Sequence, residues 1–478
     1  MAIPGSIPRP KKPAFITFLS STLLPLLFLC ALLLLLLLFI SAPLPCISSP
    51  PHLSSSWSGD LRLAEFSWNS LPFPSHHPLH TTSLKIAVFT RKWPSSSSPG
   101  GMERHALTLH SALSLRGHQI HVFTSALDHS PSSLNTLHLH PLAGRWRCDE
   151  ALSLFEEEHA ISPFDVIHSE SVALYHRFAR RIPNVAVSWH GISLEALHSS
   201  IYQDLLRRSH YEPLSSSFNR TLSSAIYKVL DEIRFFESYA HHVAISDSTG
   251  EMLRDVYQIP RGRVHVILNG VDETEFQPDL ELGIAFREEL GVPEDAELVM
   301  GVAGRLVKDK GHPLLFQAFT EIAKRYHNVY LVVAGSGPWE QRYKELGEKV
   351  IVAGALPPAK LRAFYNSIDV FVNPTLRPQG LDLTLMEAMQ CGTPVMATRF
   401  PSIKGSVVVR DELGIMFSPN VAELGNAMEK AVREGKGRMA ERGRACRAYA
   451  MEMFTARKMA MAYERLFLCI KNESFCRN

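Results

Sequence analysis

The segment 373–395, NPTLRPQGLDLTLMEAMQCGTPV, constrains the fold most strongly, because it reads as a strand, a glycine-containing loop and a short helix. The free N–H groups at a helix N-terminus favour an anionic ligand, and a glycine lets that ligand approach the backbone. Glu387, in the first helical turn, would sit beside such a ligand and accept hydrogen bonds from its hydroxyls. The segment therefore predicts a binding loop between a strand and a helix.

The same helix start has a purely structural interpretation. Thr384 and Glu387 fit a capping box, in which Thr384 caps the helix and Glu387 reaches back to the backbone. Both interpretations stay open on this segment alone, so the rest of the chain must decide between them.

Length and composition indicate a folded protein of two or three domains. The chain has 478 residues, of which 46% are hydrophobic and 20% are charged, and these values exclude a disordered or fibrous protein. The net charge is only +2. No dense stripe of Lys and Arg occurs, so no nucleic-acid partner is expected.

Residues 15–40 carry no charged side chain and include the run ALLLLLLLFI. At about 1.5 Å per residue this segment can cross a hydrocarbon core of about 30 Å, and it is longer than a secretory h-region. Three basic residues lie in 1–14 and none follows until Arg62. The positive-inside rule therefore predicts a cytoplasmic tail at 1–14, a transmembrane signal-anchor at 15–40 and a lumenal remainder. A cleaved signal peptide or a transit peptide is the alternative.

The segment 41–83 is rich in Ser, Pro and His and has no sustained apolar period. Such a composition buries too little apolar surface to fold, so it predicts a flexible stem. Asn219 and Asn472 match the N-glycosylation pattern, which matters only on the lumenal side. The seven cysteines show no metal-ligand spacing, and Cys469 with Cys476 is a candidate disulfide pair in an oxidising compartment.

The first half of the folded region repeats the order strand, loop, helix, strand. Residues 84–90 and 119–124 are apolar runs rich in strand-forming residues, and a helical pattern over 102–115 separates them. This order predicts a parallel sheet with helices on its faces. Gly100-Gly101 lies where such a unit brings its backbone near a phosphate or sugar, although a tight turn at the helix start explains the pair equally well.

His190 stands at the end of one of the further strands expected in this half. Open α/β sheets bind ligands at the carboxyl ends of their strands, so His190 is a candidate site residue, with a structural role as the alternative. These further strands are expected at 164–170, 184–191, 241–247 and 263–270.

A change of composition over 273–297 separates the two halves. This stretch is acidic, contains two prolines and lacks a strand period, so it is predicted to link a domain at 84–272 to a second domain at 298–440. The second half again alternates strands and helices from 298 onward, and 441–478 is expected to hold a C-terminal helix and tail. The fold class is therefore α/β with two domains.

The loop GRLVKDKG follows the first strand of the second half and contains Arg305 and Lys310. Two cations at the carboxyl edge of a sheet suit a diphosphate, because Arg offers a planar fork and Lys a compact charge. Two solvated surface charges are the alternative.

The motifs GRLVKDKGH, VVAGSGPW and GLDLTLMEAMQCGTPV resemble the retaining family-4 glycosyltransferases, as does ILNGVDETEFQP at the domain junction. The resemblance covers about residues 84–465 and is weaker in the first half, where GGMERHALTLHSALSLRGHQIHVFT and SWHG carry it. It implies the GT-B fold, in which two Rossmann-like domains face a cleft, here preceded by one N-terminal transmembrane helix. It also implies that a nucleotide-sugar donor binds mainly to the second domain and an acceptor to the first.

The resemblance implies roles for single residues. Arg305 and Lys310 match the pair that binds the donor diphosphate, and Glu387 matches the second Glu of the E-x7-E motif, which holds the ribose. Gly101 matches the glycine loop of the first domain, and His190 matches the histidine near the transferred sugar. His190, Arg305 and Lys310 are the expected catalytic residues.

One departure from the family lies in the loop before the helix. Gln379 stands where the family has the first Glu of E-x7-E, and Asp382 stands where a glycine is usual. An amide contributes no negative charge beside a sugar that becomes cationic in the transition state. Asp382 either supplies that carboxylate or only shapes the loop. The donor-binding residues expected in this segment are Gln379, Gly380, Asp382, Leu383 and Glu387.

The implied reaction is transfer with retention of configuration, in which the acceptor hydroxyl attacks from the face that the diphosphate leaves. A donor phosphate oxygen serves as base. No Asp-x-Asp occurs, so neither a metal nor a further cofactor is expected. The anchor and stem predict a type II Golgi membrane protein that acts on a glycan, glycoprotein or lipid acceptor. A secreted or plastid protein, released by N-terminal cleavage, is the alternative.

Two other functions remain as alternatives. A non-catalytic carbohydrate-binding or assembly subunit would keep the fold, and Gln379 favours it. A dinucleotide-dependent oxidoreductase would need G-x-G-x-x-G after the first strand, which SSSSPGGMER does not supply. The sequence favours the transferase over both.

Overall fold

The structure, a computed structural model, describes residues 83–94, 100–125, 135–207 and 216–472. The predicted tail 1–14, the membrane segment 15–40 and nearly all of the stem 41–83 lie outside the described residues. Among the helices of the described ranges, none has the length and apolar character that crossing a bilayer requires.

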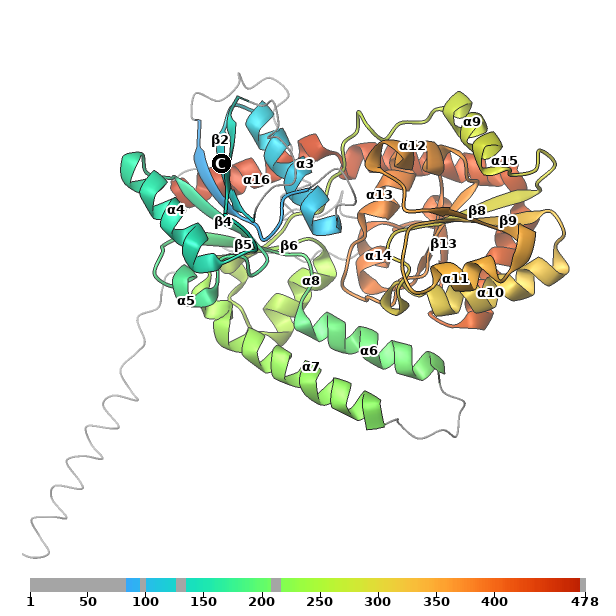
Figure 1. Ribbon diagram of the computed structural model, residues 1–478, viewed down its shortest axis with the longest axis horizontal. Coiled ribbons are helices and arrows are strands. Elements are labelled where there is room, and N and C mark those ends of the chain that lie inside the picture. Colours follow the sequence, from blue (N-terminus) through green and yellow to red (C-terminus); the bar gives the residue numbers. More distant parts are fainter. Residues whose placement is uncertain (1–82, 95–99, 126–134, 208–215, 473–478) are drawn as a thin grey trace, which may run out of the picture. The chain divides into compact units, whose positions relative to one another are not determined.

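The N-terminal lobe is built on a seven-stranded parallel sheet with the order β3-β2-β1-β4-β5-β6-β7 (Figure 1). The predicted strands form because each is a short apolar run whose side chains are buried on both faces of the sheet. β3 was not predicted, because its sequence LHLHP is polar and half-exposed at the sheet edge. The bounds are β1 Lys85–Phe89, β2 Gln119–Thr124, β3 Leu137–Pro141, β4 Val166–Glu170, β5 Val185–Trp189, β6 His241–Ala244 and β7 Val264–Val266.

The C-terminal lobe has a six-stranded parallel sheet with the order β10-β9-β8-β11-β12-β13. Both sheets therefore contain the 3-2-1-4-5-6 order of the dinucleotide-binding fold, which confirms the predicted pair of Rossmann-like domains. In this topology the order reverses beside the first strand, at β1 and β8, and ligands bind there at the strand ends. The bounds are β8 Leu298–Ala303, β9 Val329–Ala334, β10 Val350–Gly354, β11 Val370–Asn373, β12 Val395–Thr398 and β13 Gly414–Phe417.

Helices connect the parallel strands and cover the faces of both sheets (Figure 1). The stretch 273–297, expected to be a linker, holds α9, which Asp279 caps and which ends at Gly291 in a left-handed conformation. In the N-terminal lobe the helices are α3 Gly101–Leu115, α4 Cys148–Ile161, α5 His176–Ala179, α6 Ser193–Arg207, α7 Ser216–Phe235 and α8 Asp247–Glu251. They continue with α9 Leu280–Leu290, α10 His312–Arg325, α11 Glu340–Lys344, α12 Pro358–Asn366, α13 Leu383–Gln390, α14 Pro401–Ser406, α15 Val421–Met453 and α16 Ala456–Lys471.

The last helix, α16, returns to the N-terminal lobe and packs beside α3 (Figure 1). The Tyr463 hydroxyl lies 2.8 Å from Oγ of Ser188 on β5, and Arg116 pairs with Glu464. Met459, Tyr463 and several neighbours on α16 belong to the same apolar cluster as the first sheet. This packing ties α16 to the first sheet.

The described cysteines are of two kinds. Cys469 is disulfide-bonded, whereas Cys148, Cys391 and Cys446 are buried free thiols. Burial raises the pKa of Cys391 to about 12, so this thiol is unreactive. The pairing of Cys469 with Cys476 stays a prediction.

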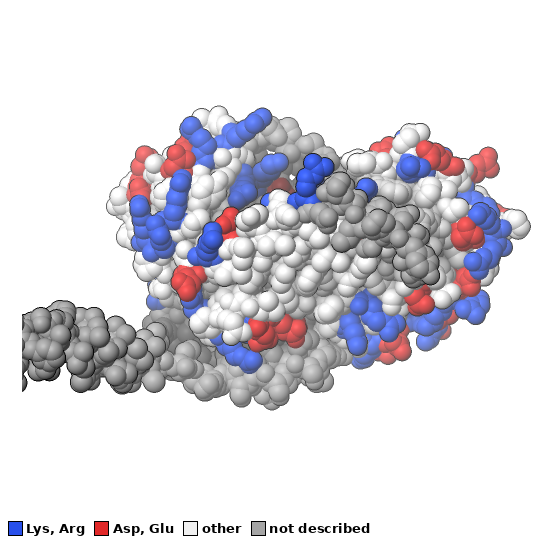
Figure 2. Space-filling model, turned by 90° about the horizontal axis from the view of Figure 1, so that it is seen from below, with Lys and Arg blue, Asp and Glu red and all other residues white. Residues whose placement is uncertain are grey.

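Charged side chains of both signs are interspersed over the face of the molecule in Figure 2. This distribution fits the net charge of +2.

Candidate active site

A cavity of about 690 Å³ is lined by the loops that follow β1, β5, β8 and β11. It receives residues from both lobes, at the strand ends where the topology places a ligand. Neither Gln379 nor Glu387 belongs to its wall. Seven of the predicted site residues do line it: Gly101, His190, Arg305, Lys310, Gly380, Asp382 and Leu383.

The two predicted phosphate ligands lie on the loop after β8. Arg305 is exposed, and Lys310 ends a single 3-10 turn, Lys308–Lys310. Gly311 follows with φ +78°, and a Cβ there would collide with the carbonyl of Pro374. Only glycine lets the loop pack this closely against the end of β11, and this packing brings Lys310 to the start of α13.

Lys310 Nζ forms an ion pair with Oδ1 of Asp382. Asn373 donates a 3.1 Å hydrogen bond to the other carboxylate oxygen. Burial alone would raise the pKa of Asp382, but Lys310, Asn373 and Arg377 together lower it. Asp382 is therefore an ionised carboxylate at the cavity wall.

Glu387 is completely buried one turn into α13. Its Oε2 accepts a 2.7 Å hydrogen bond from Tyr365, and its Oε1 forms an ion pair with Arg104 of α3. The capping-box alternative is wrong, because the helix begins at Leu383, Asp382 occupies the cap position and Thr384 lies inside the helix.

Gln379 lies where the two lobes touch. Its backbone carbonyl accepts hydrogen bonds from Ser246 at 2.9 Å and Thr249 at 3.2 Å. Its side-chain Nε2 donates to Nδ1 of His198 on α6 at 3.3 Å. Asp382, three residues further on, places a carboxylate on the cavity wall.

Three further charged residues at the site were not predicted from the sequence. Arg104 and Arg377 both line the cavity, and Arg377 pairs with the buried Glu195 of α6 at 3.0 Å. Burial raises the pKa of Glu195, although Arg377 opposes this shift. No local pattern marks these residues, since each becomes significant only through its partner on the other lobe.

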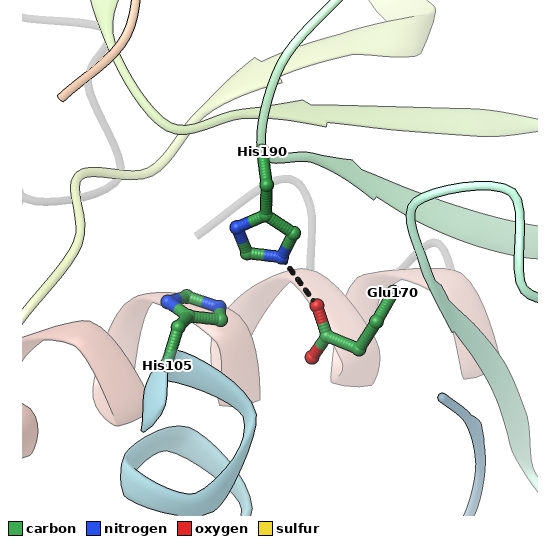
Figure 3. A group of neighbouring side chains, drawn as sticks. All are labelled: His105, Glu170 and His190. Carbon is green, nitrogen blue, oxygen red and sulfur yellow. Dashed lines mark hydrogen bonds and ion pairs between the residues drawn. The ribbon is translucent and has the colours of Figure 1, made fainter. Parts of the chain in front are cut away.

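A buried cluster surrounds His190 on the N-terminal lobe (Figure 3). Glu170, the last residue of β4, accepts hydrogen bonds from Nε2 of His190 at 2.6 Å and from Nε2 of His110 at 3.0 Å. Burial would raise the pKa of Glu170, but His168, His110 and His190 hold it well below its usual range. The carboxylate is therefore ionised.

His105 completes this cluster from α3. Its ring packs edge-on against that of His190, with centroids 4.5 Å apart, and burial lowers the pKa of His105 to about 3. Neither ring nitrogen of His105 has a hydrogen-bond partner among the described residues.

The groups His105, Glu170 and His190 also have the composition of a metal site, with ligand atoms within 4.8 Å of one another. Two ligands bound at about 2.0–2.1 Å to a tetrahedral ion lie about 3.3 Å apart. The 2.6 Å separation between Glu170 and His190 is instead that of a hydrogen bond to an ionised acceptor. The geometry fits a hydrogen-bonded network better than a metal centre.

The predicted glycosylation sites lie on different elements of the fold. Asn219 falls within α7, and Asn472 is exposed directly after α16. Neither is part of the cavity wall.

Two family models match the chain. "Glycosyltransferase Family 4" matches residues 99–275 and "Glycosyl transferases group 1" matches residues 297–434. The matches cover one lobe each and together about two thirds of the chain, including Gly101, His190, Lys310 and Glu387.

Similar proteins agree with these matches. An uncharacterised glycosyltransferase of Methanocaldococcus jannaschii is 27% identical over 66% of this chain and 80% of its own length. Among solved structures, sucrose-phosphate synthase from Thermosynechococcus elongatus has a TM-score of 0.64 at 19% identity, covering 83% of this chain and all of its own. Anabaena HepE in complex with UDP-glucose has a TM-score of 0.57 at 17% identity, covering 80% of this chain and 99% of its own.

The oxidoreductase alternative is therefore wrong, and so is a subunit without catalytic function. The two parallel sheets and the cavity between the lobes have the GT-B arrangement, and both lobes match the same family. The chain belongs to the family-4 glycosyltransferases, which are retaining enzymes that transfer a sugar from a nucleotide-sugar donor.

Proposed function

We propose that the cavity binds a UDP- or GDP-linked sugar with its diphosphate against Arg305 and Lys310. One observation carries the proposal: both cations line the same cavity as Gly101 and His190 of the opposite lobe. A diphosphate between these groups would have its charge neutralised from one lobe while its sugar meets the other. HepE, which binds UDP-glucose, makes UDP-glucose the first donor to test.

Asp382 takes over the electrostatic task that Gln379 cannot perform. Its ionised carboxylate lies on the cavity wall beside Lys310. A negative charge there stabilises a sugar that becomes cationic as the diphosphate leaves. Lys310, held between Asp382 and the leaving group, stabilises the growing negative charge on the phosphate. Glu387 holds the donor ribose once Arg104 gives up one carboxylate oxygen.

Transfer then proceeds with retention. The acceptor hydroxyl approaches from the face that the diphosphate leaves and loses its proton to a donor phosphate oxygen, so no protein nucleophile is required. His190 contacts the transferred sugar from the N-terminal lobe.

The enzyme works in the lumen of the secretory pathway, anchored in the Golgi membrane through residues 15–40, on a glycan, glycoprotein or lipid acceptor. The uncharged segment and the basic residues before it support this location, as does the disulfide bond of Cys469. Endoglycosidase treatment of the protein expressed in eukaryotic cells tests it. A mobility shift that Asn219→Gln and Asn472→Gln together abolish is expected, whereas an unglycosylated protein facing the cytosol would contradict it.

The reaction is tested by measuring nucleoside diphosphate release from a panel of UDP- and GDP-sugars, with the full-length chain purified in detergent and simple glycosides as acceptors. Release from one donor, with retained anomeric configuration in the product, is expected. Excess EDTA should leave the rate unchanged, because no Asp-x-Asp is present to hold a metal.

Two variants serve as controls. Glu387→Ala should abolish release, since it removes the ribose ligand, whereas Lys308→Ala should not, because Lys308 is exposed on the same loop outside the cavity. Saturable donor binding without release by the unmodified chain would contradict the proposed reaction.

A further inference from the structure

Glu170 uses both of its carboxylate oxygens to hold histidines, and Figure 3 shows the contact with His190. Oε2 accepts from Nε2 of His190 at 2.6 Å, and Oε1 accepts from Nε2 of His110 at 3.0 Å. Glu170 itself is 0% exposed at the end of β4. A fully buried carboxylate with two imidazole donors is fixed in both position and ionisation.

The hydrogen bond to Glu170 determines which nitrogen of His190 carries the proton. An ionised carboxylate only accepts, so Nε2 of His190 must be the donor. In the neutral ring, Nδ1 is then unprotonated, and it points away from Glu170 (Figure 3). His190 lines the cavity, whereas Glu170 does not. Glu170 can therefore act on a bound ligand only through His190.

We propose that Glu170 is a positioning residue, which keeps Nε2 of His190 protonated so that Nδ1 accepts a hydrogen bond from a hydroxyl of the bound sugar. The identity of the hydroxyl rests on the proposed function, but the assignment of a proton to Nε2 rests on the Glu170 contact alone. A hydroxyl group both donates and accepts, so an acceptor nitrogen of fixed direction selects one orientation of the sugar.

The residues around Glu170 and His190 restrict the movement of these two side chains. His105 packs edge-on against the His190 ring at 4.5 Å between centroids, which limits rotation of that ring. His168, also on β4, donates or accepts at Nε2 with Ser188 at 2.8 Å, and its Nδ1 lies 3.9 Å from Glu170. The Tyr463 hydroxyl of α16 closes the network at Ser188. Residues from α3, β4, β5 and α16 thus hold the Glu170–His190 pair in place.

Nitrogen-15 NMR of the histidine-labelled full-length protein tests the proton position directly and needs no activity. The His190 signals are identified by their loss in His190→Gln. We expect a protonated Nε2 and an unprotonated Nδ1, and a change in this pattern in Glu170→Gln. A protonated Nδ1 in the unmodified protein, or an unchanged His190 pattern in Glu170→Gln, would overturn the proposal.

Glu464→Gln is the matched control. Glu464 is also a buried glutamate of this lobe that accepts a 3.0 Å hydrogen bond from a histidine, His118, but it lies outside the cavity. This variant should leave the His190 signals unchanged and should release nucleoside diphosphate at the normal rate per folded molecule. Spectral changes at His190 from zinc addition alone would point to a metal centre and would also overturn the proposal.

A double-mutant cycle with Glu170→Gln and His190→Ala separates positioning from general destabilisation. Glu170→Gln should lower kcat about tenfold or more, comparable to losing the orienting partner of a ligating histidine, with a smaller change in the donor KM. In the His190→Ala background, Glu170→Gln should lower kcat by less than about twofold, because Glu170 acts on the reaction through His190. Equal losses in both backgrounds would assign Glu170 a merely structural role.

The remaining outcomes are distinguishable. Should the unmodified protein release no nucleoside diphosphate, the proposed function fails while the NMR pattern still decides the role of Glu170. Should Glu170→Gln not fold by circular dichroism, Glu170→Asp replaces it, since it keeps the charge but withdraws the carboxylate from His190. Glu170→Asp should then show the same loss of the His190 proton pattern, and a retained pattern would overturn the proposal.

Discussion

Arg104 of α3 forms an ion pair with Glu387 of α13, so the predicted ribose ligand is held by the opposite lobe. The second oxygen of Glu387 is occupied by the Tyr365 hydroxyl at 2.7 Å. A carboxylate buried to this extent needs a cation nearby, and Arg104 supplies it. A ligand hydroxyl that bonds Glu387 must therefore compete with Arg104, which also borders the cavity.

Breaking this pair from one side should destabilise the protein more than removing both partners. Arg104→Ala leaves Glu387 buried without its cation, and we expect it to lower the free energy of unfolding by about 2–3 kcal/mol. This loss is smaller than that for a fully buried pair, because the Arg104 side chain is 20% exposed. Arg104→Ala with Glu387→Gln should recover part of this loss. Thermal denaturation of the four proteins measures the coupling, and strictly additive losses would contradict it. The exposed pair Lys324–Glu321 is the control, worth less than about 1 kcal/mol.

Removing either proposed phosphate ligand should slow turnover. Arg305→Ala and Lys310→Ala each delete a charge that stabilises the leaving diphosphate, and we expect at least a hundredfold lower kcat/KM, equivalent to about 3 kcal/mol. Steady-state release of nucleoside diphosphate measures the effect, with Lys308→Ala as the control on the same loop. Near-normal rates in either variant would exclude a role in charge stabilisation.

Restoring the usual glutamate at position 379 should not improve the enzyme. The Gln379 side chain contacts His198 and does not line the cavity, so Gln379→Glu adds a charge at the lobe contact without bringing it to the sugar. Asp382→Asn should instead lower kcat at least tenfold, because it removes the carboxylate from the wall and releases Lys310. Measuring kcat of both variants with the same donor shows which of the two positions supplies the carboxylate beside the sugar. A gain of activity in Gln379→Glu would show that Gln379 reaches the sugar.

The sheets and part of the cavity could be predicted because their signals are local. Most strands are continuous apolar runs between turn residues, and Arg305 and Lys310 follow one of them directly. β3 and β13 were not predicted, because the sequence LHLHP of β3 is polar and the sequence GIMF of β13 is very short. Local patterns thus identify elements and the loops at their ends.

Contacts between the lobes could not be predicted in this way. Arg104 with Glu387, and Gln379 with His198, are pairs whose members lie on different sheets and far apart in the chain. The position of Asp382 beside Lys310 depends on Gly311 packing against Pro374, which becomes visible only once the loop is folded. The role of a loop residue at such a site therefore depends on the tertiary structure.

Acid should destabilise the fold well above the pKa values of its carboxylates, because several buried histidines are neutral. Burial lowers the pKa of His242 to about 3, whereas an unfolded histidine has a pKa of about 6.5. Below about pH 6.5, His242 binds a proton in the unfolded chain but stays neutral in the folded chain. The free energy of unfolding therefore falls as the pH drops from about 6.5 towards 3. At pH 5 each such histidine contributes a loss of about 2 kcal/mol.

His242→Asn isolates this effect outside the active site. Asn can still accept the hydrogen bond that Trp189 Nε1 donates to Nδ1 of His242 at 3.0 Å, but it does not titrate. The melting temperature of this variant should fall less than that of the unmodified protein between pH 7.5 and pH 5. His327→Asn, at an exposed position, should follow the unmodified protein. An identical fall in all three would mean that His242 is protonated in the folded chain, and acid sensitivity would then have to come from the carboxylate pairs instead.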